Sequence, residues 1–268
     1  MRTRFAPTPS GYLHTGNVVH LAVVRNVASE LGASIALRID DIDTPRLRRE
    51  YLDDIFEVMQ WMEVGWDQGP RTTDDVLNRG GMGVTPAHMC AVLNRARAAG
   101  LDTYACNCSR RELAAHTGQP CGCSVASVDW EPGVTALRMR IPRGTVVSID
   151  GVSIDVSHEL GDVVLWRRDD LPSYQLASVI ADAQLGTDLL IRGVDLRTST
   201  ALQVHLAPAL GAPELATART LHHRLIVDTQ GRKLSKSAGA QGRPLERTPE
   251  LRSRIEDIAA DVTAEILG

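Results

Sequence analysis

The sequence predicts an α/β protein whose parallel sheet is interrupted by an antiparallel insert. Two observations support this fold class. Apolar stretches of strand type alternate with amphipathic helical segments in the first and last thirds of the chain, which is typical of a parallel sheet. Between them, four strand-like stretches follow one another, and Arg143-Gly144 and Asp150-Gly151 provide turns of the kind that join antiparallel strands.

The first third of the chain contains two strand signals, each followed by a helix signal. The segment Pro7-Thr8-Pro9-Ser10-Gly11 forces a turn after the first strand, because proline fixes φ and glycine tolerates positive φ. Thr44 precedes Pro45 and is expected to cap the second helix. The elements expected here are a strand over 2–6, a helix with its apolar face over 18–28, a strand over 34–39, a helix over 45–62, a loop over 68–85 and a helix over 86–99.

The rest of the chain returns to strand–helix alternation after the antiparallel stretch. Gly211 is placed to end a helix, since glycine adopts the left-handed conformation that is common at helix C-termini. The elements expected here are strands over 136–141, 146–149, 153–156 and 163–167, a helix over 174–183, a strand over 189–191, a helix over 195–210, a strand over 220–227 and a C-terminal helix over 246–268.

The composition is that of a globular chain with a weak negative charge. Its 268 residues include 29 Lys and Arg against 33 Asp and Glu, and 43% are hydrophobic, which is enough for a core. No apolar run reaches the ~20 residues that span a bilayer and no signal peptide follows Met1, so a cytoplasmic protein without a membrane partner is expected. A nucleic-acid-binding face would have to be a local patch, around residues 46–49 or 167–168, where a solvated surface is at least as good an explanation.

The segment His14-Thr15-Gly16-Asn17 lies where the first strand gives way to the first helix. A helix N-terminus presents free backbone N–H groups and the positive end of the helix dipole, which favours phosphate. His14 can donate to a phosphate oxygen there, and Gly16 lets a flat ring such as adenine approach the backbone. Taken alone, His14 is better explained as a hydrogen-bonded turn residue.

A second segment, Lys233-Leu234-Ser235-Lys236-Ser237, lies near the other end of the chain. A flexible cationic loop of this kind can stabilise triphosphate charge as it shifts toward pyrophosphate. Taken alone, a solvated basic loop is the better explanation. The two segments together indicate activation of a carboxylate by ATP, and the chain has neither a Walker loop nor a G-x-G-x-x-G pattern.

The two segments resemble the signature sequences of class I aminoacyl-tRNA synthetases. The longer stretch Arg4-Phe5-Ala6-Pro7-Thr8-Pro9-Ser10-Gly11 is similar to the opening of glutamyl- and glutaminyl-tRNA synthetases. Residues 37–46, 174–177 and 191–196 agree with the same group. The resemblance covers about residues 4–237 and implies a Rossmann-like nucleotide-binding fold with an inserted acceptor-binding subdomain that carries a zinc-binding segment.

Chain length narrows the resemblance to the glutamyl-queuosine tRNA(Asp) synthetases. Only 31 residues follow Ser237, where full glutamyl-tRNA synthetases carry an anticodon-binding region. The resemblance implies activation of glutamate with ATP and Mg²⁺, followed by transfer to the queuosine base of tRNA(Asp). A monomer is expected. It also implies a split catalytic domain over 1–104 and 168–245, an insert over 105–167, a C-terminal helix over 246–268 and no anticodon-binding domain.

The resemblance assigns roles to the residues at matching positions. The catalytic residues would be His14, Lys233 and Lys236, which would stabilise the charge that develops as a carboxylate attacks the α-phosphate of ATP. The residues expected to bind ATP are Pro7, His14, Gly16, Asn17, Lys233, Ser235 and Lys236. The residues expected to bind the amino acid are Arg4, Ala6, Thr8, Asp40, Tyr174, Ser178 and Arg192.

The proposed amino-acid pocket has the chemistry that an acidic amino acid requires. Its ammonium needs a carboxylate, which Asp40 can offer, and its carboxylates need cations such as Arg4 and Arg192. The alternative is an internal ion pair, for example of Arg4 or Arg38 with an aspartate. The family usually has glutamate where this chain has Asp40, and one methylene fewer retracts the carboxylate by ~1.5 Å. A different amino acid, or a glutamate site completed by water, therefore stays open.

Four of the five cysteines form two C-x-C pairs, Cys106 with Cys108 and Cys121 with Cys123. In a cytosolic enzyme such clustering favours a metal over disulfides, and four thiolates would make a closed, structural zinc site. His116 is an alternative ligand, and reduced thiols without metal are the other explanation. The resemblance favours zinc, although the family often has a tyrosine and one later cysteine where this chain has its second pair.

Two other functions stay open on the sequence. One is a ligase of the same fold that activates another amino acid and transfers it to a small-molecule or carrier acceptor. The other is a non-catalytic tRNA-binding module, against which the presence of His14, Lys233 and Lys236 argues.

Overall fold

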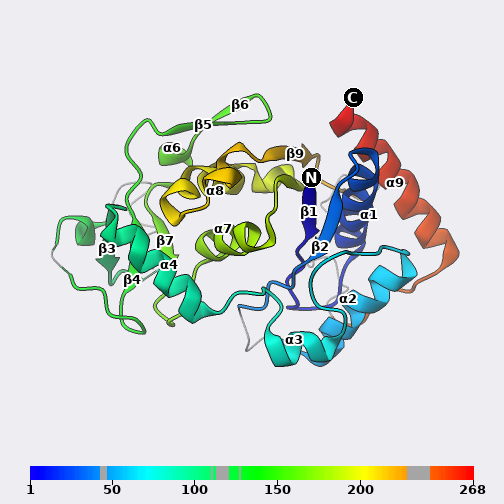
Figure 1. The fold of residues 1–268 in the computed structure, drawn as a ribbon, viewed down its shortest axis with the longest axis horizontal. Coiled ribbons are helices and arrows are strands. Elements are labelled where there is room, and N and C mark those ends of the chain that lie inside the picture. The colour runs from blue at the N-terminus through cyan, green and yellow to red at the C-terminus, as the bar shows by residue number, and fades with distance from the viewer. Residues whose placement is uncertain (43–46, 110, 113–120, 127, 228–241) are drawn as a thin grey trace. The chain divides into compact units, whose positions relative to one another are not determined.

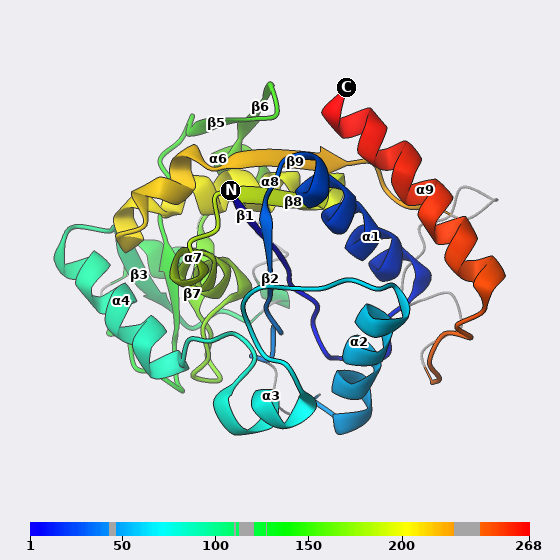
Figure 2. The ribbon, with the colours of Figure 1, turned by 45° about the vertical axis from the view of Figure 1, so that its right-hand side comes forward.

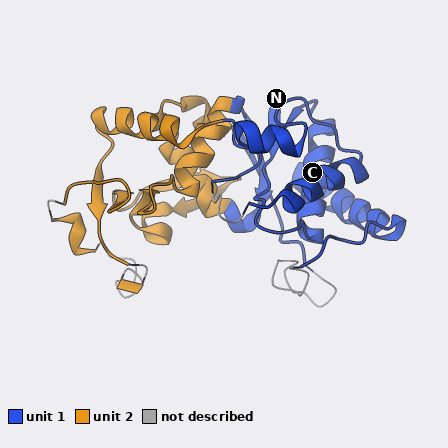
Figure 3. Ribbon diagram, turned by 90° about the horizontal axis from the view of Figure 1, so that it is seen from below, with its two compact units in different colours: residues 1–83, 185–196, 218–268 blue, residues 84–184, 197–217 orange. Residues whose placement is uncertain are grey.

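The structure is a computed structural model that describes residues 1–268 except 43–46, 110, 113–120, 127 and 228–241 (Figure 1). Thr44, His116 and the lysine segment with Lys233, Ser235 and Lys236 therefore lie outside the described residues. The chain forms two compact units (Figure 3). The first comprises 1–83, 185–196 and 218–268, and the second comprises 84–184 and 197–217.

The first unit is built on a parallel sheet. Strand β1 (Arg2–Phe5) pairs in parallel with β2 (Ser34–Leu37), and β8 (Leu189–Gly193) pairs in parallel with β9 (Arg219–His223). The backbone N–H of Asp188 donates to the Arg2 carbonyl at 3.1 Å, which places β8 beside β1. The parallel pair β1–β2 thus lies next to the parallel pair β8–β9 (Figure 2), and the predicted parallel pairing is confirmed.

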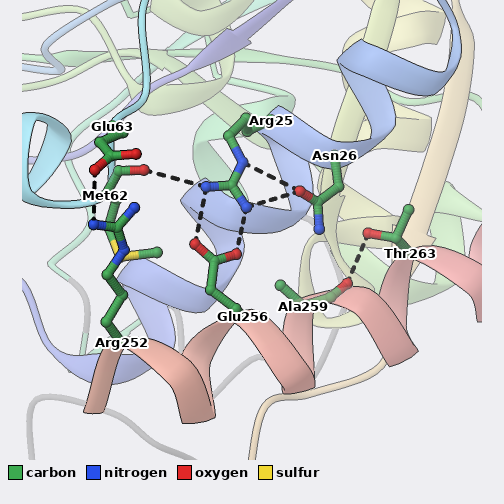
Figure 4. Close-up of polar contacts among 8 residues, drawn as sticks. All are labelled: Arg25, Asn26, Met62, Glu63, Arg252, Glu256, Ala259 and Thr263. Atoms are coloured by element: carbon green, nitrogen blue, oxygen red, sulfur yellow. Dashed lines mark hydrogen bonds and ion pairs between the residues drawn. The ribbon is translucent and has the colours of Figure 1, made fainter. Parts of the chain in front are cut away.

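The α-helices in the described residues of this unit are α1 (Thr15–Glu30), α2 (Arg49–Trp61), α3 (Thr73–Arg79) and α9 (Pro249–Leu267). The fully buried valines and leucines of α1 pack with the strands and with α9 into one hydrophobic core. Polar contacts flank that packing (Figure 4): Arg25 on α1 holds Glu256 on α9 with both terminal nitrogens, and Arg252 donates to Glu63 at 3.0 Å. The C-terminal helix is thereby fixed to the helix that begins at His14.

Helix α3 corrects the expectation of a loop over 68–85. The hydroxyl of Thr72 accepts from the backbone N–H of Asp75 at 3.1 Å, and the Asp75 carboxylate accepts from the N–H of Thr72 at 3.1 Å. This capping box satisfies two N–H groups that would otherwise lack partners at the helix start. The pattern Thr72-Thr73-Asp74-Asp75 is typical of a helix start. The glycines that follow it favoured the prediction of a loop instead.

The second unit contains the predicted antiparallel strands. Strands β3 (Thr103–Cys106), β4 (Ala136–Met139) and β7 (Val163–Trp166) form one antiparallel sheet, and β5 (Val146–Ile149) and β6 (Val152–Asp155) form a hairpin. The sequence had not predicted β3. It had also extended a strand over Val156, which instead begins helix α6 (Val156–Leu160), because the Asp155 carboxylate caps the N–H of His158 at 3.0 Å.

The helices of the second unit lie close to their predicted positions. Besides α6, the described residues of this unit form the longer helices α4 (Pro86–Ala98), α7 (Tyr174–Leu185) and α8 (Arg197–Leu206). The predicted helix over 195–210 is divided into α8 and two flanking 3₁₀ turns, and it ends as expected at Gly211, whose φ of +78° is left-handed. The last predicted strand is shorter than expected, because β9 ends at His223.

Within the part of the chain that the structure describes, no helix combines the length and the apolar character needed to cross a membrane.

Candidate active site

His14 caps the first helix at the point where the sequence placed it. Its Nδ1 accepts the backbone N–H of Asn17 at 3.3 Å, and the Asn17 side-chain oxygen accepts the backbone N–H of His14 at 3.2 Å. A ring nitrogen that accepts carries no proton, so the neutral imidazole holds its proton on Nε2. The turn role and the donor role are thus compatible, since Nδ1 forms the cap while Nε2 carries the proton that a donor needs.

The neighbouring residues predicted to bind ATP shape the same turn. Pro7 is buried, and its carbonyl accepts the backbone N–H of Asp40 at 2.9 Å. Gly16 lies in the first turn of α1, and Asn17 completes the cap. The structure therefore brings Pro7, His14, Gly16 and Asn17 together where β1 leads into α1, which is the carboxyl edge of the parallel sheet. Ligands of open α/β sheets bind at this edge.

Two buried arginines lie on adjacent strands of the sheet. Arg4 on β1 is 4% exposed and Arg192 on β8 is 3% exposed. Both act on His20 of α1, whose pKa is lowered well below its usual value by burial first, then by His223 and by the positive charges of the two arginines. Buried guanidinium groups on two neighbouring strands are groups that can pair with carboxylate oxygens.

His20 and His223 form a pair that the sequence had not predicted. Nδ1 of His20 and Nε2 of His223 lie 3.0 Å apart, and Nδ1 of His223 lies 2.7 Å from the carbonyl of Arg224. His223 therefore donates from Nδ1 to that carbonyl. Because burial lowers the pKa of both histidines, both rings are neutral at neutral pH, and Nε2 of His223 then accepts from Nδ1 of His20. The sequence offered one indication of a buried histidine, because His20 lies between Val19 and Leu21 within the apolar run of α1.

This pair predicts a loss of stability in mild acid. Burial lowers the pKa of His20 and, more weakly, that of His223, so the unfolded chain binds more protons than the native one once the pH falls below the usual histidine pKa. The neutral histidine pair therefore contributes fully to the free energy of unfolding above the usual histidine pKa, and this contribution is lost as the pH falls below it. We expect the Tm to fall between pH 7.5 and pH 5.5 by about 2–4 °C for each kcal/mol lost.

Thermal unfolding measured across this pH range checks the expectation. The variant His20→Gln removes one of the two titrating rings and should flatten the dependence of Tm on pH. An equally steep dependence in that variant would contradict the assignment.

Asp40 is engaged by Arg38. Its Oδ1 accepts from Nε of Arg38 at 2.7 Å and its Oδ2 accepts from Nη2 at 3.2 Å, and the Arg38 residue is 1% exposed. The structure thus contains the internal ion pair that was the alternative for this aspartate. A carboxylate has about four lone-pair sites, so the pairing leaves acceptor capacity, and the role of Asp40 toward an ammonium group stays a prediction. Ala6 is half-buried and Thr8 is exposed at the same strand end.

Tyr174 and Ser178 belong to the second unit. Tyr174 is the first residue of α7 and is 41% exposed, whereas Ser178, one turn later, is fully buried. Tyr174 lines a cavity of about 460 Å³ in that unit. Its other walls include Arg138, Arg167, Arg168 and Asp169, and Asp169 forms an ion pair with Arg167. The cavity thus combines an exposed tyrosine with a lining in which arginines outnumber acidic residues.

The four paired cysteines meet beside that cavity. The sulfurs of Cys106 and Cys121 lie 3.6 Å apart, those of Cys108 and Cys123 lie 3.7 Å apart, and all four lie within 4.8 Å of one another. A tetrahedral zinc ion with bonds of ~2.3 Å would space its sulfurs by ~3.8 Å. The donor set and its spacing therefore fit a metal ion, which the four cysteines could hold.

Strand β3 and a 3₁₀ turn position these sulfurs. Cys106 ends β3, and Cys121 and Cys123 flank Gly122, where the 3₁₀ turn Gly122–Ser124 starts. Burial raises the pKa of Cys106 to about 11 and that of Cys108 to about 12. Burial opposes ionisation of Cys121 as well, but hydrogen bonds from the thiols of Cys106 and Cys108 lower its pKa. Cys121 is therefore the thiol of the cluster that loses its proton most readily, and a bound metal ion would favour ionisation of the others.

The chain matches the family described as tRNA synthetases class I (E and Q), catalytic domain, over residues 1–119 and 122–244. It is 36% identical to a glutamyl-Q tRNA(Asp) synthetase of Pseudomonas aeruginosa over 91% of this chain and 80% of that protein. A protein of the same name from Burkholderia cenocepacia is 36% identical over 93% of this chain and 84% of that protein. The glutamate-tRNA synthetase of Elizabethkingia anophelis has a similar fold, with a TM-score of 0.69 at 23% identity; the match covers 91% of this chain and 54% of that one.

Proposed function

Because the chain belongs to the class I tRNA synthetases of the E and Q group, we propose that it activates glutamate with ATP and transfers the glutamyl group to the queuosine base of tRNA(Asp). The observation that carries this proposal is the sheet edge of the first unit, where a helix-capping histidine and two buried arginines lie at the ends of neighbouring strands. These groups suit a phosphate and a dicarboxylic amino acid.

Activation is a displacement at phosphorus. An oxygen of the glutamate α-carboxylate attacks the α-phosphorus of ATP, the bond from that phosphorus to the bridging oxygen breaks, and pyrophosphate leaves with the electron pair. The nucleophile is already ionised, so no protein base is required. Catalysis then consists of positioning and of stabilising negative charge as it develops.

The residues of the first signature have a defined part in this step. His14 donates from Nε2 to a phosphate oxygen, and the free N–H groups at the start of α1 add to the positive potential. Lys233 and Lys236, with Ser235, take the complementary role on the triphosphate by resemblance to the family. Mg²⁺ bound with ATP would offset part of the triphosphate charge.

Arg4 and Arg192 recognise the carboxylates of glutamate in this proposal. Their burial makes a hydrogen-bonded carboxylate a stronger partner than it would be in water. Asp40 can accept from the α-ammonium with the lone pairs that Arg38 leaves free. By resemblance to the family, Ala6 and Thr8 would also belong to the amino-acid pocket, at the end of β1 in the first unit.

Transfer uses a hydroxyl of the acceptor. The hydroxyl oxygen attacks the glutamyl carbonyl carbon, the bond to the adenylate oxygen breaks, and AMP leaves while the hydroxyl proton passes to solvent or to the leaving phosphate. The arginines and the exposed ring of Tyr174 around the 460 Å³ cavity support a nucleotide in the second unit. Phosphates favour arginine, and bases stack on aromatic rings.

Exchange and transfer assays test the proposed function. ATP–pyrophosphate exchange across the twenty amino acids should require glutamate, and labelled glutamate should then appear on queuosine-containing tRNA(Asp) and not on queuosine-free tRNA. Exchange without transfer to any tRNA would favour the ligase with a small-molecule acceptor. Absence of exchange with every amino acid would favour the non-catalytic module.

Zinc is the metal that best suits the cysteine cluster, because four thiolates in a tetrahedral spacing form its usual structural site. Cys106, Cys108, Cys121 and Cys123 would hold it, and the ion would brace the end of β3 against the following 3₁₀ turn. Since ligand thiols must lose their protons, affinity should fall in acid.

We expect metal analysis of the purified chain to find about one zinc per molecule and the variant Cys106→Ser to lose most of it. Cys90→Ser is the matched control, because Cys90 is the cysteine outside the cluster. Equal zinc contents in the two variants would contradict the ligand assignment.

A further inference from the structure

A buried carboxylate on α2 joins two segments that are far apart in the chain. Oδ2 of Asp54 accepts the backbone N–H of Leu13 at 2.8 Å, and Oδ1 of the same carboxylate accepts from Nη2 of Arg247. Leu13 immediately precedes His14, and Arg247 lies just before Thr248, which caps α9. One side chain thus contacts both the histidine turn and the segment that leads into the C-terminal helix.

The surroundings make Asp54 a rigid support. Its side chain is 2% exposed, and that of Arg247 is 22% exposed. Helix α2 is anchored in the core by Leu52, Ile55 and Val58, each fully buried. A carboxylate on such a helix has little freedom to follow the groups that bond to it, so its partners are fixed with respect to the core.

A second contact from α2 holds the same turn. The ring of Tyr12 packs edge-on against that of Tyr51 with centroids 5.1 Å apart. Tyr51 and Asp54 are three residues apart and therefore lie on one face of α2. Two residues in succession, Tyr12 by its ring and Leu13 by its N–H, are tied to this face directly before His14.

Arg247 controls the state of that carboxylate. Burial raises the pKa of Asp54, and the Leu13 N–H and the Arg247 guanidinium oppose that rise. Arg247 also donates from Nη1 to Glu57 at 2.8 Å, so it spans two carboxylates one turn apart on α2. Thr248 accepts the N–H of Leu251 at 3.2 Å, which fixes this part of the backbone at the start of α9.

We propose that Asp54 is a positioning residue for the reaction: it sets the place of His14 through the Leu13 N–H, and Arg247 keeps it ionised and oriented. This inference rests on the proposed function. A displacement of about 1 Å in a group that stabilises the transition state can cost roughly 100-fold in rate. The link therefore bears on turnover rather than on the binding of glutamate, whose arginines lie on β1 and β8.

The test measures kcat and KM for ATP–pyrophosphate exchange in Asp54→Ala, Asp54→Asn and Arg247→Met. Asp54→Ala and Arg247→Met should lower kcat by about 10- to 100-fold at equal folded fraction, with the KM for glutamate little changed. Asp54→Asn keeps an acceptor for the Leu13 N–H and loses only the ion pair, so it should retain more activity than Asp54→Ala.

Arg252→Met is the matched control. Arg252 lies in the first turn of α9 and forms an ion pair with Glu63 (Figure 4). Within the described part of the chain, the hydrogen bonds of Leu13 and Asp54 do not involve Arg252. It should keep kcat within about twofold, as expected for an exposed pair. A loss of kcat in Arg252→Met equal to that in Arg247→Met, or an unchanged kcat in Asp54→Ala, would overturn the inference.

Amide hydrogen exchange distinguishes this failure from a failure of the proposed function. The Leu13 amide should exchange much faster in Asp54→Ala than in Arg252→Met, whatever reaction the protein catalyses. A Leu13 amide that stays protected in Asp54→Ala would overturn the link itself. A wild-type chain whose Leu13 amide is protected, but which shows no ATP–pyrophosphate exchange with any amino acid, would overturn the proposed function. It would also overturn the role of the Asp54–Leu13 hydrogen bond in turnover.

Discussion

Replacing His14 by asparagine is expected to lower the rate of ATP–pyrophosphate exchange by about 100- to 1000-fold, the loss typical of removing one preorganised donor to a developing negative charge. Asparagine is a favourable N-cap, and its side-chain oxygen can take over the bond from the backbone N–H of Asn17 that Nδ1 of His14 now accepts. It offers no group in the place of Nε2. The variant therefore separates the cap from the donor.

The comparison with His14→Ala makes this test specific. Alanine removes the cap as well and should cost about 1 kcal/mol of further stability with little additional loss of exchange. Thermal unfolding monitored by circular dichroism, together with exchange kinetics at saturating ATP and glutamate, gives both quantities. An exchange rate in His14→Asn close to that of the wild type would show that the histidine serves only as a cap.

Replacing Arg192 by leucine is expected to lower kcat/KM for glutamate by about 100-fold or more. Truncation of one partner in a buried charge pair costs roughly 2–5 kcal/mol, because the other charge is left buried and unpaired. Arg192 is 3% exposed, so water cannot replace it as the partner of a bound carboxylate. The change should be expressed mainly in the KM for glutamate, with the KM for ATP little affected.

Two further variants separate recognition from stability. Arg192→Lys keeps the charge and loses the planar fork, so it should recover part of the affinity. Arg4→Leu should resemble Arg192→Leu, because both arginines act on His20 from adjacent strands. If Arg192→Leu left the KM for glutamate unchanged at equal folded fraction, the arginine would have a structural role only.

The two histidine roles and the two arginines belong to one arrangement in the first unit. His14 opens α1 and His20 lies on the same helix, next to Phe5 at the end of β1, with ring centroids 6.2 Å apart. His223 ends β9 and pairs with Gly193 of β8 in the sheet register. The neutral histidine pair thus packs beside the two cations without adding charge to them. Protonation of that pair would place a third positive charge there, which accounts for the expected loss of stability in acid.

Much of the fold was predictable because its signals are local. The turn before His14 depends on prolines and a glycine within eleven residues, and the helix that follows depends on an uninterrupted apolar run. The two C-x-C pairs predicted a cysteine cluster, and the four sulfurs do lie close together. The errors were local too. The capping box of Thr72 begins a short helix where the glycines had suggested a loop. The cap by Asp155 begins another where β-branched residues had suggested a longer strand.

The sequence by itself determined the strand–helix order, the position of His14 at a helix start and the supply of four thiols, because each depends on neighbours within a few turns of chain. Only the tertiary structure decided which side chains meet. His20 and His223 are 203 residues apart, and Asp54 reaches Leu13 and Arg247 across 41 and 193 residues. The sequence pattern does not predict such pairs, because the packing of strands and helices brings them together and the spacing of residues along the chain does not.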